Sequence, residues 1–294
     1  MSEKPTTKPA AKAANAEEAA YAKKAAAKRG SKKMSDKLTA VGAIGAAIGT
    51  EVAKVIIGKS HVIDNVMIDI LSNGNLLFDD YPGLAKTLMT NTFADALGCD
   101  FKRVQFTPDL LPADITGTNI YDAKKGEFTF KPGPIFCNLL LSDEINRAPP
   151  KTQAALLEAI QEHQVTRAAA RKKDAVEVEV ITDPARVVAM QQAIEEVYVD
   201  PAVRMYMVEL VSRTREDPRV LVGSSPRGSL ALLKTSRSAA AMRGRDFVTP
   251  DDVKSVAILA IAHRLILKPE HQIKGLENEE VVSDILRQVP VPTV

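Results

Sequence analysis

Two short stretches of this chain carry side chains that could act on a polyphosphate. Lys86 and Thr87 follow an apolar run and a turn, and they open a predicted helix. At such a helix start, backbone N–H groups face the phosphates, a lysine reaches the outer phosphates, and a threonine hydroxyl ligates Mg²⁺. Asp143 and Glu144 end a second apolar run. Because ligands collect at the carboxyl ends of parallel strands, we expect these four residues to surround one nucleoside triphosphate.

Each carboxylate has a distinct expected role. Asp143 would hold Mg²⁺, directly or through water, and Glu144 would orient and polarise the attacking water. An isolated acidic pair after a core strand is more often a solvated turn. Only the combination of this pair with the preceding phosphate turn favours the nucleotide interpretation.

The phosphate turn departs from the strict pattern G-x-x-x-x-G-K-[ST]. Both glycine positions are changed, because Asp80 and Ala85 stand there. A glycine before the lysine allows the backbone to approach the phosphates closely, and the Ala85 methyl group restricts that approach. We therefore expect weakened ATP binding. The turn residues expected to contact the nucleotide are Tyr81, Pro82, Gly83, Leu84, Ala85, Lys86 and Thr87.

Length and composition indicate two globular domains preceded by a basic tail. The 294 residues are 45% hydrophobic and 26% charged, and the net charge is only +2. Residues 1–34 hold nine Lys or Arg against three Glu, which predicts a disordered or loosely helical extension. Aromatic residues make up 4% and Trp is absent, which argues against a stacking platform for nucleic acid. Weak binding of nucleic acid or of an acidic partner by the tail is an alternative.

Cysteine content and hydropathy favour a cytoplasmic protein. Cys99 and Cys137 are too few for a disulfide framework, and we expect buried thiols in a reducing compartment. We expect no signal peptide at the start of the chain. The apolar run 38–49 is too short to span a bilayer. The four histidines lie far apart in sequence and predict no metal site.

Periodicity predicts an α/β core followed by a helical domain. Asp200-Pro201 and Thr249-Pro250 are helix-start signals for an all-helical second domain. In the core we expect helices at 35–57, 86–97 and 150–163, strands at 76–78, 101–106 and 138–141, and a hairpin near 119–130. A further helix after the first is expected to carry Val62, Val66, Ile70 and Leu71 at helical spacing. We expect the strand at 138–141 to be buried on both faces, since it is apolar throughout.

Several motifs resemble the MoxR family of AAA+ ATPases. The most specific is Asp143-Glu144-Ile145-Asn146-Arg147-Ala148-Pro149-Pro150-Lys151-Thr152-Gln153-Ala154-Ala155-Leu156-Leu157-Glu158. Others are Tyr81 to Thr87, Gln105 to Gly117, Gly126 to Phe128, Pro132 to Phe136, Ser225-Pro226-Arg227-Gly228 and His263 to Leu267.

The resemblance implies a fold, an activity and partners. The fold is a three-layer P-loop core with a parallel sheet and a small all-α C-terminal lid. Ile57 and Gly58 would lie beside adenine, and the hairpin would be the helix-2 insert. Arg227 would be the sensor 2 arginine, whose alternative interpretation is a surface arginine at a helix end. The family implies ATP and Mg²⁺, a hexameric ring, a chaperone or remodelling role, and partners with a von Willebrand factor A domain.

The chain also departs from the family by being shorter. We expect a tail at 1–34, a core at 35–166, a linker at 167–186 and a lid at 187–294. After the core, several dozen residues of the family pattern have no counterpart, including sensor 1 and the arginine finger. Residues 175–181 alternate like a half-exposed strand, but their glutamates suit a central strand poorly. This indicates a deletion variant or an internally shortened gene, and it leaves two hypotheses: a working ATPase, or a nucleotide-binding assembly subunit that cannot hydrolyse ATP.

Overall fold

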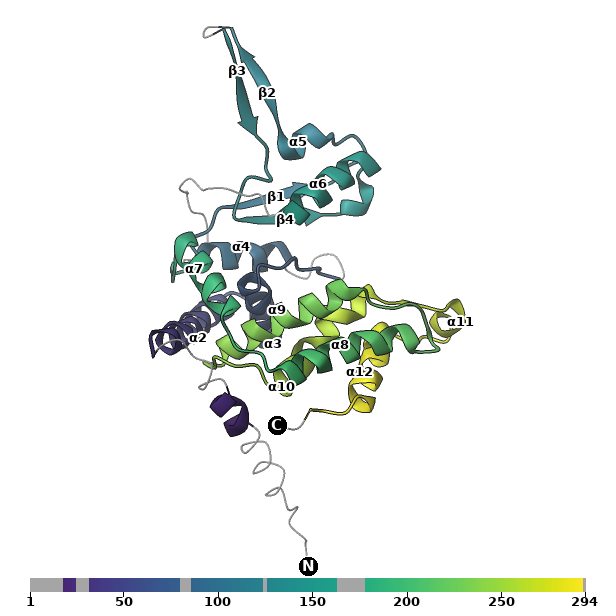
Figure 1. The fold of residues 1–294 in the computed structure, drawn as a ribbon. Helices are drawn as coiled ribbons and strands as arrows, with labels where there is room; N and C mark the ends of the chain where they lie inside the picture. Colours follow the sequence, from purple (N-terminus) through teal and green to yellow (C-terminus); the bar gives the residue numbers. More distant parts are fainter. Residues whose placement is uncertain (1–17, 25–31, 80–85, 124–125, 163–177, 293–294) are drawn as a thin grey trace, which may run out of the picture. The chain divides into compact units, whose positions relative to one another are not determined.

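The computed structural model describes residues 18–24, 32–79, 86–123, 126–162 and 178–292 (Figure 1). The chain divides into two compact units. We call one the helical unit, which comprises residues 1–46, 64–74 and 188–294, and the other the sheet unit, which comprises residues 47–63 and 75–187. Three helices contribute residues to both units: α2 (Lys32–Ala53), α3 (Ser60–Leu71) and α7 (Pro184–Glu195).

The sheet unit has three layers. Strand β1 (Phe101–Gln105) pairs in parallel with β4 (Leu139–Asp143), and Gln105 stands opposite Asp143. Helix α4 (Lys86–Ala96) contacts β4, whereas α6 (Pro150–Glu162) covers the other face, so the strands lie between the two helices (Figure 1). On the α6 side the core consists of Val104, Phe106, Ile115, Ile135, Ala148 and Leu156. This arrangement confirms the prediction of an α/β core with a parallel sheet.

Two predictions about the strands of this sheet are wrong. Residues 76–78 form no strand, and Leu76 and Leu77 are 40% and 69% exposed. All five residues of β4 are only half-buried, although we expected burial on both faces. Both errors have one physical cause: within the described residues β4 pairs only with β1, so no strand lies beside it to cover its other edge or to pair with residues 76–78.

The predicted hairpin is confirmed and is slightly longer than expected. It consists of β2 (Gly117–Asp122) and β3 (Glu127–Pro132), and it extends from the part of its unit formed by α5 (Pro112–Thr116) and α6 (Figure 1). The short helix α5 was not predicted. Tyr121 stands opposite Phe128, with ring centroids 5.2 Å apart, and Phe130 follows on the same face. All three aromatic side chains are exposed, so the hairpin presents an apolar face to solvent.

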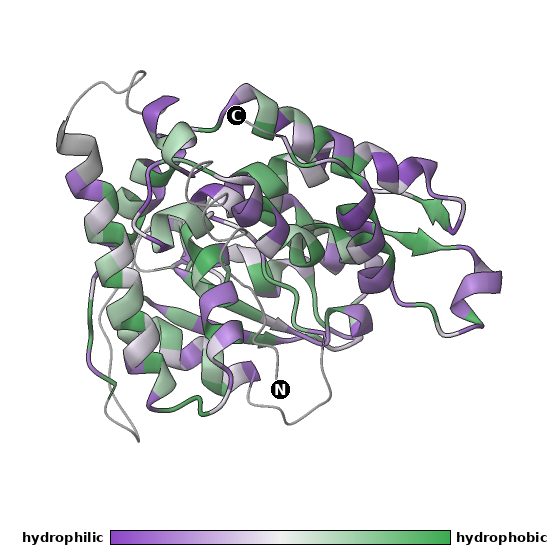
Figure 2. Ribbon diagram, turned by 90° about the horizontal axis from the view of Figure 1, so that it is seen from below, coloured by the Kyte–Doolittle hydropathy of each residue, from purple (hydrophilic) through white to green (hydrophobic). Residues whose placement is uncertain are grey.

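The helical unit is built around amphipathic helices. Figure 2 shows hydrophobic and hydrophilic residues interspersed along them. Their buried side chains form its core, and a two-stranded antiparallel ribbon lies among them. Its C-terminal elements are α8 (Pro201–Glu216), β5 (Val220–Val222), α9 (Pro226–Met242), α10 (Pro250–Ile261), β6 (Ile266–Leu267), α11 (Pro269–Gln272) and α12 (Asn278–Gln288).

The predicted helix starts are present as side-chain caps. The carboxylate of Asp200 accepts a hydrogen bond from the Ala202 N–H at 2.9 Å, which caps α8. Thr249 and Asp252 form a reciprocal capping box at the start of α10. Both caps precede a proline in the first turn, so the sequence signals and the observed boundaries agree.

Part of the basic tail packs on the helical unit. Residues 18–24 are helical, and Tyr21 is 1% exposed with its hydroxyl 3.1 Å from the Pro292 carbonyl oxygen. Lys24 forms an ion pair with Asp200 at 3.3 Å. The rest of the predicted tail, up to residue 31, lies outside the described residues.

Both cysteines are free and buried, as expected. Burial raises the pKa of the Cys99 thiol and that of the Cys137 thiol to about 11. In the part of the chain that the structure describes, no helix has the length and apolar character needed to cross a membrane.

A buried carboxylate stabilises the helical unit. Asp252 is fully buried, and Arg245 donates to it at 2.6 and 2.8 Å while Arg243 also binds it. Burial by itself raises the pKa of Asp252, but hydrogen bonds and the charge of Arg245 outweigh this effect and hold the pKa below its ordinary value of 3.8. The stabilisation is therefore present above about pH 4 and is lost as the pH falls below that value.

We predict that Asp252→Ala lowers the free energy of unfolding by about 3 kcal/mol, because it leaves two arginines without their acceptor. Urea denaturation at pH 7 measures this loss. Asp251→Ala is the matched control, since its side chain is 78% exposed, and it should change stability by less than about 0.5 kcal/mol. Equal effects of the two substitutions would contradict a buried charge pair.

Candidate functional site

Lys86 and Thr87 begin helix α4, as predicted. The Lys86 ammonium lies 3.5 Å from the carbonyl oxygen of Phe78, so it faces back toward the segment that precedes the phosphate turn. Helix α4 ends shortly before β1 begins, with Gly98 in the left-handed conformation (φ +63°) that the sequence predicts for a helix C-cap. This short connection makes α4 antiparallel to the strands, so its N-terminus lies toward their carboxyl ends.

Asp143 lies on the face of the sheet that α4 covers. Alternate residues of a strand point to opposite faces, and Val104 packs on the α6 side. Arg103 and Gln105 therefore point to the α4 side, and so does Asp143, which stands opposite Gln105. The structure thus brings Lys86 and Asp143 to the same side of one sheet, where we expected them.

The Asp143 carboxylate is partly exposed and already paired. Arg103 donates to it with Nη2 and Oδ2 2.5 Å apart. The two side chains are 43% and 37% exposed. A partly solvated carboxylate at the end of a parallel strand can accept a cation without rearrangement of the core.

Glu144 adopts an unusual backbone conformation. Its φ of +56° lies in the left-handed region, which costs a residue with a Cβ about 1–2 kcal/mol. Gln105 donates to its carboxylate at 3.3 Å, and Arg147 forms an ion pair with it at 3.2 Å. Strained conformations of this kind concentrate at functional sites. The turn after β4 therefore turns the Glu144 carboxylate back toward the strand end, where Gln105 and Arg147 hold it.

The remaining predicted residues of the nucleotide site are placed only in part. Tyr81, Pro82, Gly83, Leu84 and Ala85 lie outside the described residues. Ile57 is 85% exposed, and Gly58 has φ +77°, in the sheet unit. Their proximity to adenine stays a prediction.

Arg227 lies in the first turn of α9, in the helical unit. It is exposed, and its positive charge contributes to the pKa of Arg264. Burial and then the positive charge of Arg227 lower the pKa of Arg264. Arg264 also donates from Nε to the Ala260 carbonyl oxygen at 2.8 Å.

The donor atoms present fit Mg²⁺ bound together with a nucleotide. Among the described residues, no group of three or more His, Cys, Asp or Glu side chains is arranged to hold a metal ion. Mg²⁺ usually takes one or two protein oxygens and completes its shell with water and substrate phosphates. The Asp143 carboxylate and the Thr87 hydroxyl supply hard oxygen ligands of this kind.

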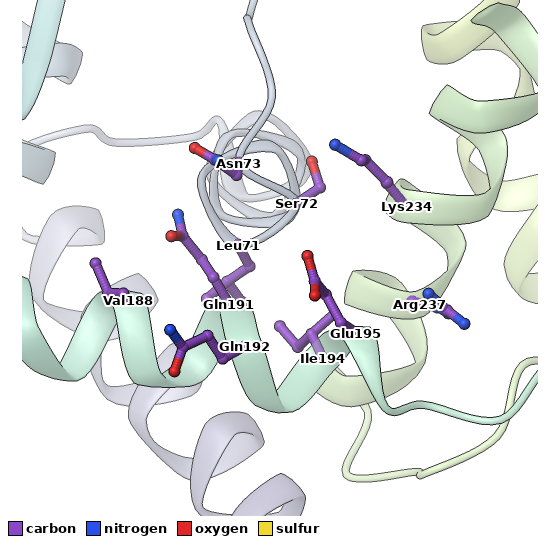
Figure 3. A pocket seen from close by; sticks show the side chains of 10 residues that line it. All are labelled: Leu71, Ser72, Asn73, Val188, Gln191, Gln192, Ile194, Glu195, Lys234 and Arg237. Atoms are coloured by element: carbon purple, nitrogen blue, oxygen red, sulfur yellow. The ribbon is translucent and has the colours of Figure 1, made fainter. Parts of the chain in front are cut away.

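A separate cavity of about 220 Å³ lies within the helical unit. Figure 3 shows that its lining side chains come from the end of α3, from α7 and from α9. Lys234 and Glu195 extend into it from different helices (Figure 3). The cavity contains none of the predicted nucleotide-binding residues. We therefore assign it no part in phosphate chemistry.

Comparison with protein-family models gives two matches. Residues 75–202 match the ATPase family associated with various cellular activities (AAA), and residues 212–285 match the AAA lid domain. Together the matches cover more than half of the chain. Two curated relatives indicate which group of AAA ATPases the chain resembles.

Chaperone MoxR1 of Mycobacterium tuberculosis is 32% identical over 306 residues, which span 83% of this chain and 81% of MoxR1. The protein YeaC of Bacillus subtilis is 34% identical over 294 residues, which span 81% of this chain and 92% of YeaC. The chain belongs to the MoxR family of AAA+ ATPases. This confirms the resemblance inferred from the motifs.

Solved structures support the same fold for this MoxR-family chain. A crystal structure of a Cytophaga hutchinsonii protein described as an ATPase superposes with a TM-score of 0.78 at 30% identity, covering 89% of this chain and 99% of that protein. A full-length MCM homologue from Methanopyrus kandleri superposes with a TM-score of 0.51 at 16% identity, over 79% of this chain and 61% of that one. The second likeness concerns the fold alone.

The alignments also bear on the shortened core of this MoxR-family chain. The alignment with YeaC is 294 positions long. It covers only 81% of the 294 residues of this chain, which is several dozen residues fewer than the length of the alignment. The alignment must therefore contain gaps in this chain of that order. The absence of one segment after residue 166 stays a prediction.

Three residues of the site were not identified from sequence as functional: Arg103, Gln105 and Arg147. Gln105 and Arg147 lie inside recognised motifs, but spacing alone gave them no role. Their roles depend on the β1–β4 register and on the backbone conformation at Glu144. One sequence signal could have identified Gln105. It is a polar residue at the last position of a predicted strand that neighbours the strand ending in Asp143 and Glu144.

The left-handed conformation at position 144 gives a stability test. We predict that Glu144→Gly is more stable than Glu144→Ala by about 1 kcal/mol, because only glycine adopts positive φ without strain. Both variants lose the carboxylate contacts, so their difference isolates the backbone. Urea denaturation of the two proteins measures it, and an alanine variant as stable as the glycine variant would refute the strained turn.

Proposed function

We propose that this chain binds ATP with Mg²⁺ at the carboxyl ends of β1 and β4 and hydrolyses it to remodel partner proteins. The family membership and the name of the relative MoxR1, a chaperone, support the general role. We further propose a hexameric ring, partners that carry a von Willebrand factor A domain, and a cytoplasmic location consistent with two free buried thiols.

One observation carries the proposal. Asp143 and Glu144 stand side by side at a strand end, and separate residues hold each of them, with Arg103 on the first and Gln105 and Arg147 on the second. Two carboxylates held apart in this way can take different roles. A merely solvated acidic turn would require neither the left-handed backbone of Glu144 nor its hydrogen bond to Gln105.

The residues of the chain divide the chemistry among them. Mg²⁺, when bound, would neutralise charge on the phosphates, with Asp143 and Thr87 as its protein ligands. Lys86 would bind the outer phosphates, and the α4 N-terminus would add backbone N–H donors. Glu144 would accept a hydrogen bond from the attacking water and orient it in line. The family resemblance supports Arg227 as the sensor 2 arginine, which would counter negative charge on a bound phosphate.

A second candidate function is nucleotide binding without hydrolysis. Within the described residues β4 pairs only with β1, and residues 76–78 form no strand; both observations favour this second function because they fit the predicted absence of a segment of the family pattern. That segment would carry sensor 1 and the arginine finger, and such an arginine contributes about 10³–10⁵ in rate. The chain would then act as an assembly subunit.

We predict that Lys86→Ala raises the dissociation constant for ATP at least about 10-fold, because a charge-assisted contact to phosphate is lost. Glu144→Gln should retain binding but lower the hydrolysis rate by about 10² or more, because an amide cannot accept the proton of water. Equilibrium binding of a fluorescent ATP analogue and steady-state phosphate release measure the two effects.

Lys102→Ala serves as the matched control for Lys86. Lys102 lies on β1, its ammonium donates to the Phe136 carbonyl at 3.2 Å, and it points to the α6 face of the sheet. Its substitution should leave ATP binding unchanged. Wild-type hydrolysis no faster than that of Glu144→Gln would reject the ATPase and leave the assembly subunit, provided that Lys86 still affects binding.

A further inference from the structure

The ion pair between Arg103 and Asp143 has a role that the proposed function does not assign. Arg103 lies on β1 and its Nη2 is 2.5 Å from Oδ2 of Asp143 on β4. Short contacts of this kind between a guanidinium and a carboxylate are charge-assisted hydrogen bonds. The arginine therefore binds the same carboxylate that we assign to Mg²⁺.

The strand register fixes this contact. Arg103 stands opposite Leu141 and two residues before Gln105, which stands opposite Asp143. Arg103 and Asp143 are thus diagonal neighbours on one face of a parallel pair, within reach of a long side chain. The pair forms without any distortion of the strands, and it lies on the face that α4 covers.

The same site treats its two carboxylates differently. Glu144 is bound by Gln105 at 3.3 Å and by Arg147 at 3.2 Å, and neither contact involves Asp143. Arg103 contacts Asp143 alone among the carboxylates of the site. Its charge therefore acts on the metal ligand and leaves the water-orienting carboxylate to other residues.

A guanidinium at this position opposes a divalent cation in two ways. It occupies an oxygen of the Asp143 carboxylate that would otherwise ligate or approach Mg²⁺, and its positive charge repels the ion at short range. The pair is more than a third exposed on both sides, so the arginine can leave into water without breaking a packed core.

We propose that Arg103 is a positioning residue that competes with Mg²⁺ for Asp143, and so sets the Mg²⁺ concentration at which the nucleotide complex forms. This inference rests on the proposed ATP and Mg²⁺ site. In the nucleotide-free protein Arg103 holds the carboxylate in place. When Mg²⁺ and nucleotide bind, Arg103 releases Asp143.

The experiment is a Mg²⁺ titration of nucleotide binding by the full chain. A fluorescent ATP analogue is held at a subsaturating concentration, and bound nucleotide is followed by anisotropy from EDTA-treated protein upward in Mg²⁺. Arg103→Gln should lower the half-saturating Mg²⁺ concentration about two- to five-fold, the range that an exposed ion pair supports. Arg103→Lys retains a cation near Asp143, so its titration should stay near that of the wild type.

Lys102→Gln is the matched control, since it removes a positive charge from the same strand but from the opposite face of the sheet, where Lys102 donates to the Phe136 carbonyl oxygen. It should leave the Mg²⁺ dependence unchanged. A second control is Asp143→Asn, in which Arg103→Gln should have no further effect because the contested carboxylate is gone.

The possible failures are distinguishable. An unchanged or higher Mg²⁺ requirement for Arg103→Gln, with Mg²⁺-dependent binding intact in the wild type, overturns this inference and leaves the proposed function standing. An equal shift for Lys102→Gln also overturns it, since the effect would then come from net charge. A wild-type chain whose nucleotide binding is absent or independent of Mg²⁺ overturns the proposed function together with this inference.

Discussion

The parallel register between β1 and β4 is the constraint on which the candidate site depends. It places Gln105 opposite Asp143 and sets Arg103 one step back along the same face. From there each polar side chain reaches a different carboxylate. A shift of β4 by one residue against β1 would send Asp143 to the α6 face, away from Arg103 and Gln105, because strand side chains alternate. Backbone pairing thus decides which chemistry the strand ends can support.

The sheet that provides this register is small. Within the described residues it has two strands, and residues 76–78, which lead to the phosphate turn, form no strand. Apolar residues on both faces stabilise the pair, with α6 on one side and α4 on the other. The residues of β4 are nevertheless only half-buried, so helices α4 and α6 do not fully cover this strand. Because β4 is only partly enclosed, the carboxylates of Asp143 and Glu144 at its end stay accessible to solvent.

Much of the fold could be predicted from sequence because its signals are local. Gly98 closes α4, and the Asp200 and Thr249 caps begin their helices where proline and capping residues indicated. The strand at 76–78 could not be judged locally, because pairing depends on a neighbour that the segment itself does not encode. The left-handed backbone of Glu144 and the contacts of Arg103 and Gln105 were likewise invisible, since they arise from register and turn geometry. Motif resemblance supplied the family, but it did not supply these contacts.

The pair of arginines on the helical unit has a consequence for energetics. Arg264 is partly buried, and burial first and then the positive charge of Arg227 lower its pKa. The fold therefore holds the Arg264 guanidinium where burial and a neighbouring cation both disfavour its charge. A multivalent anion bound beside the two arginines would offset the repulsion between their charges. Part of the binding free energy of such a ligand would then come from removing that repulsion.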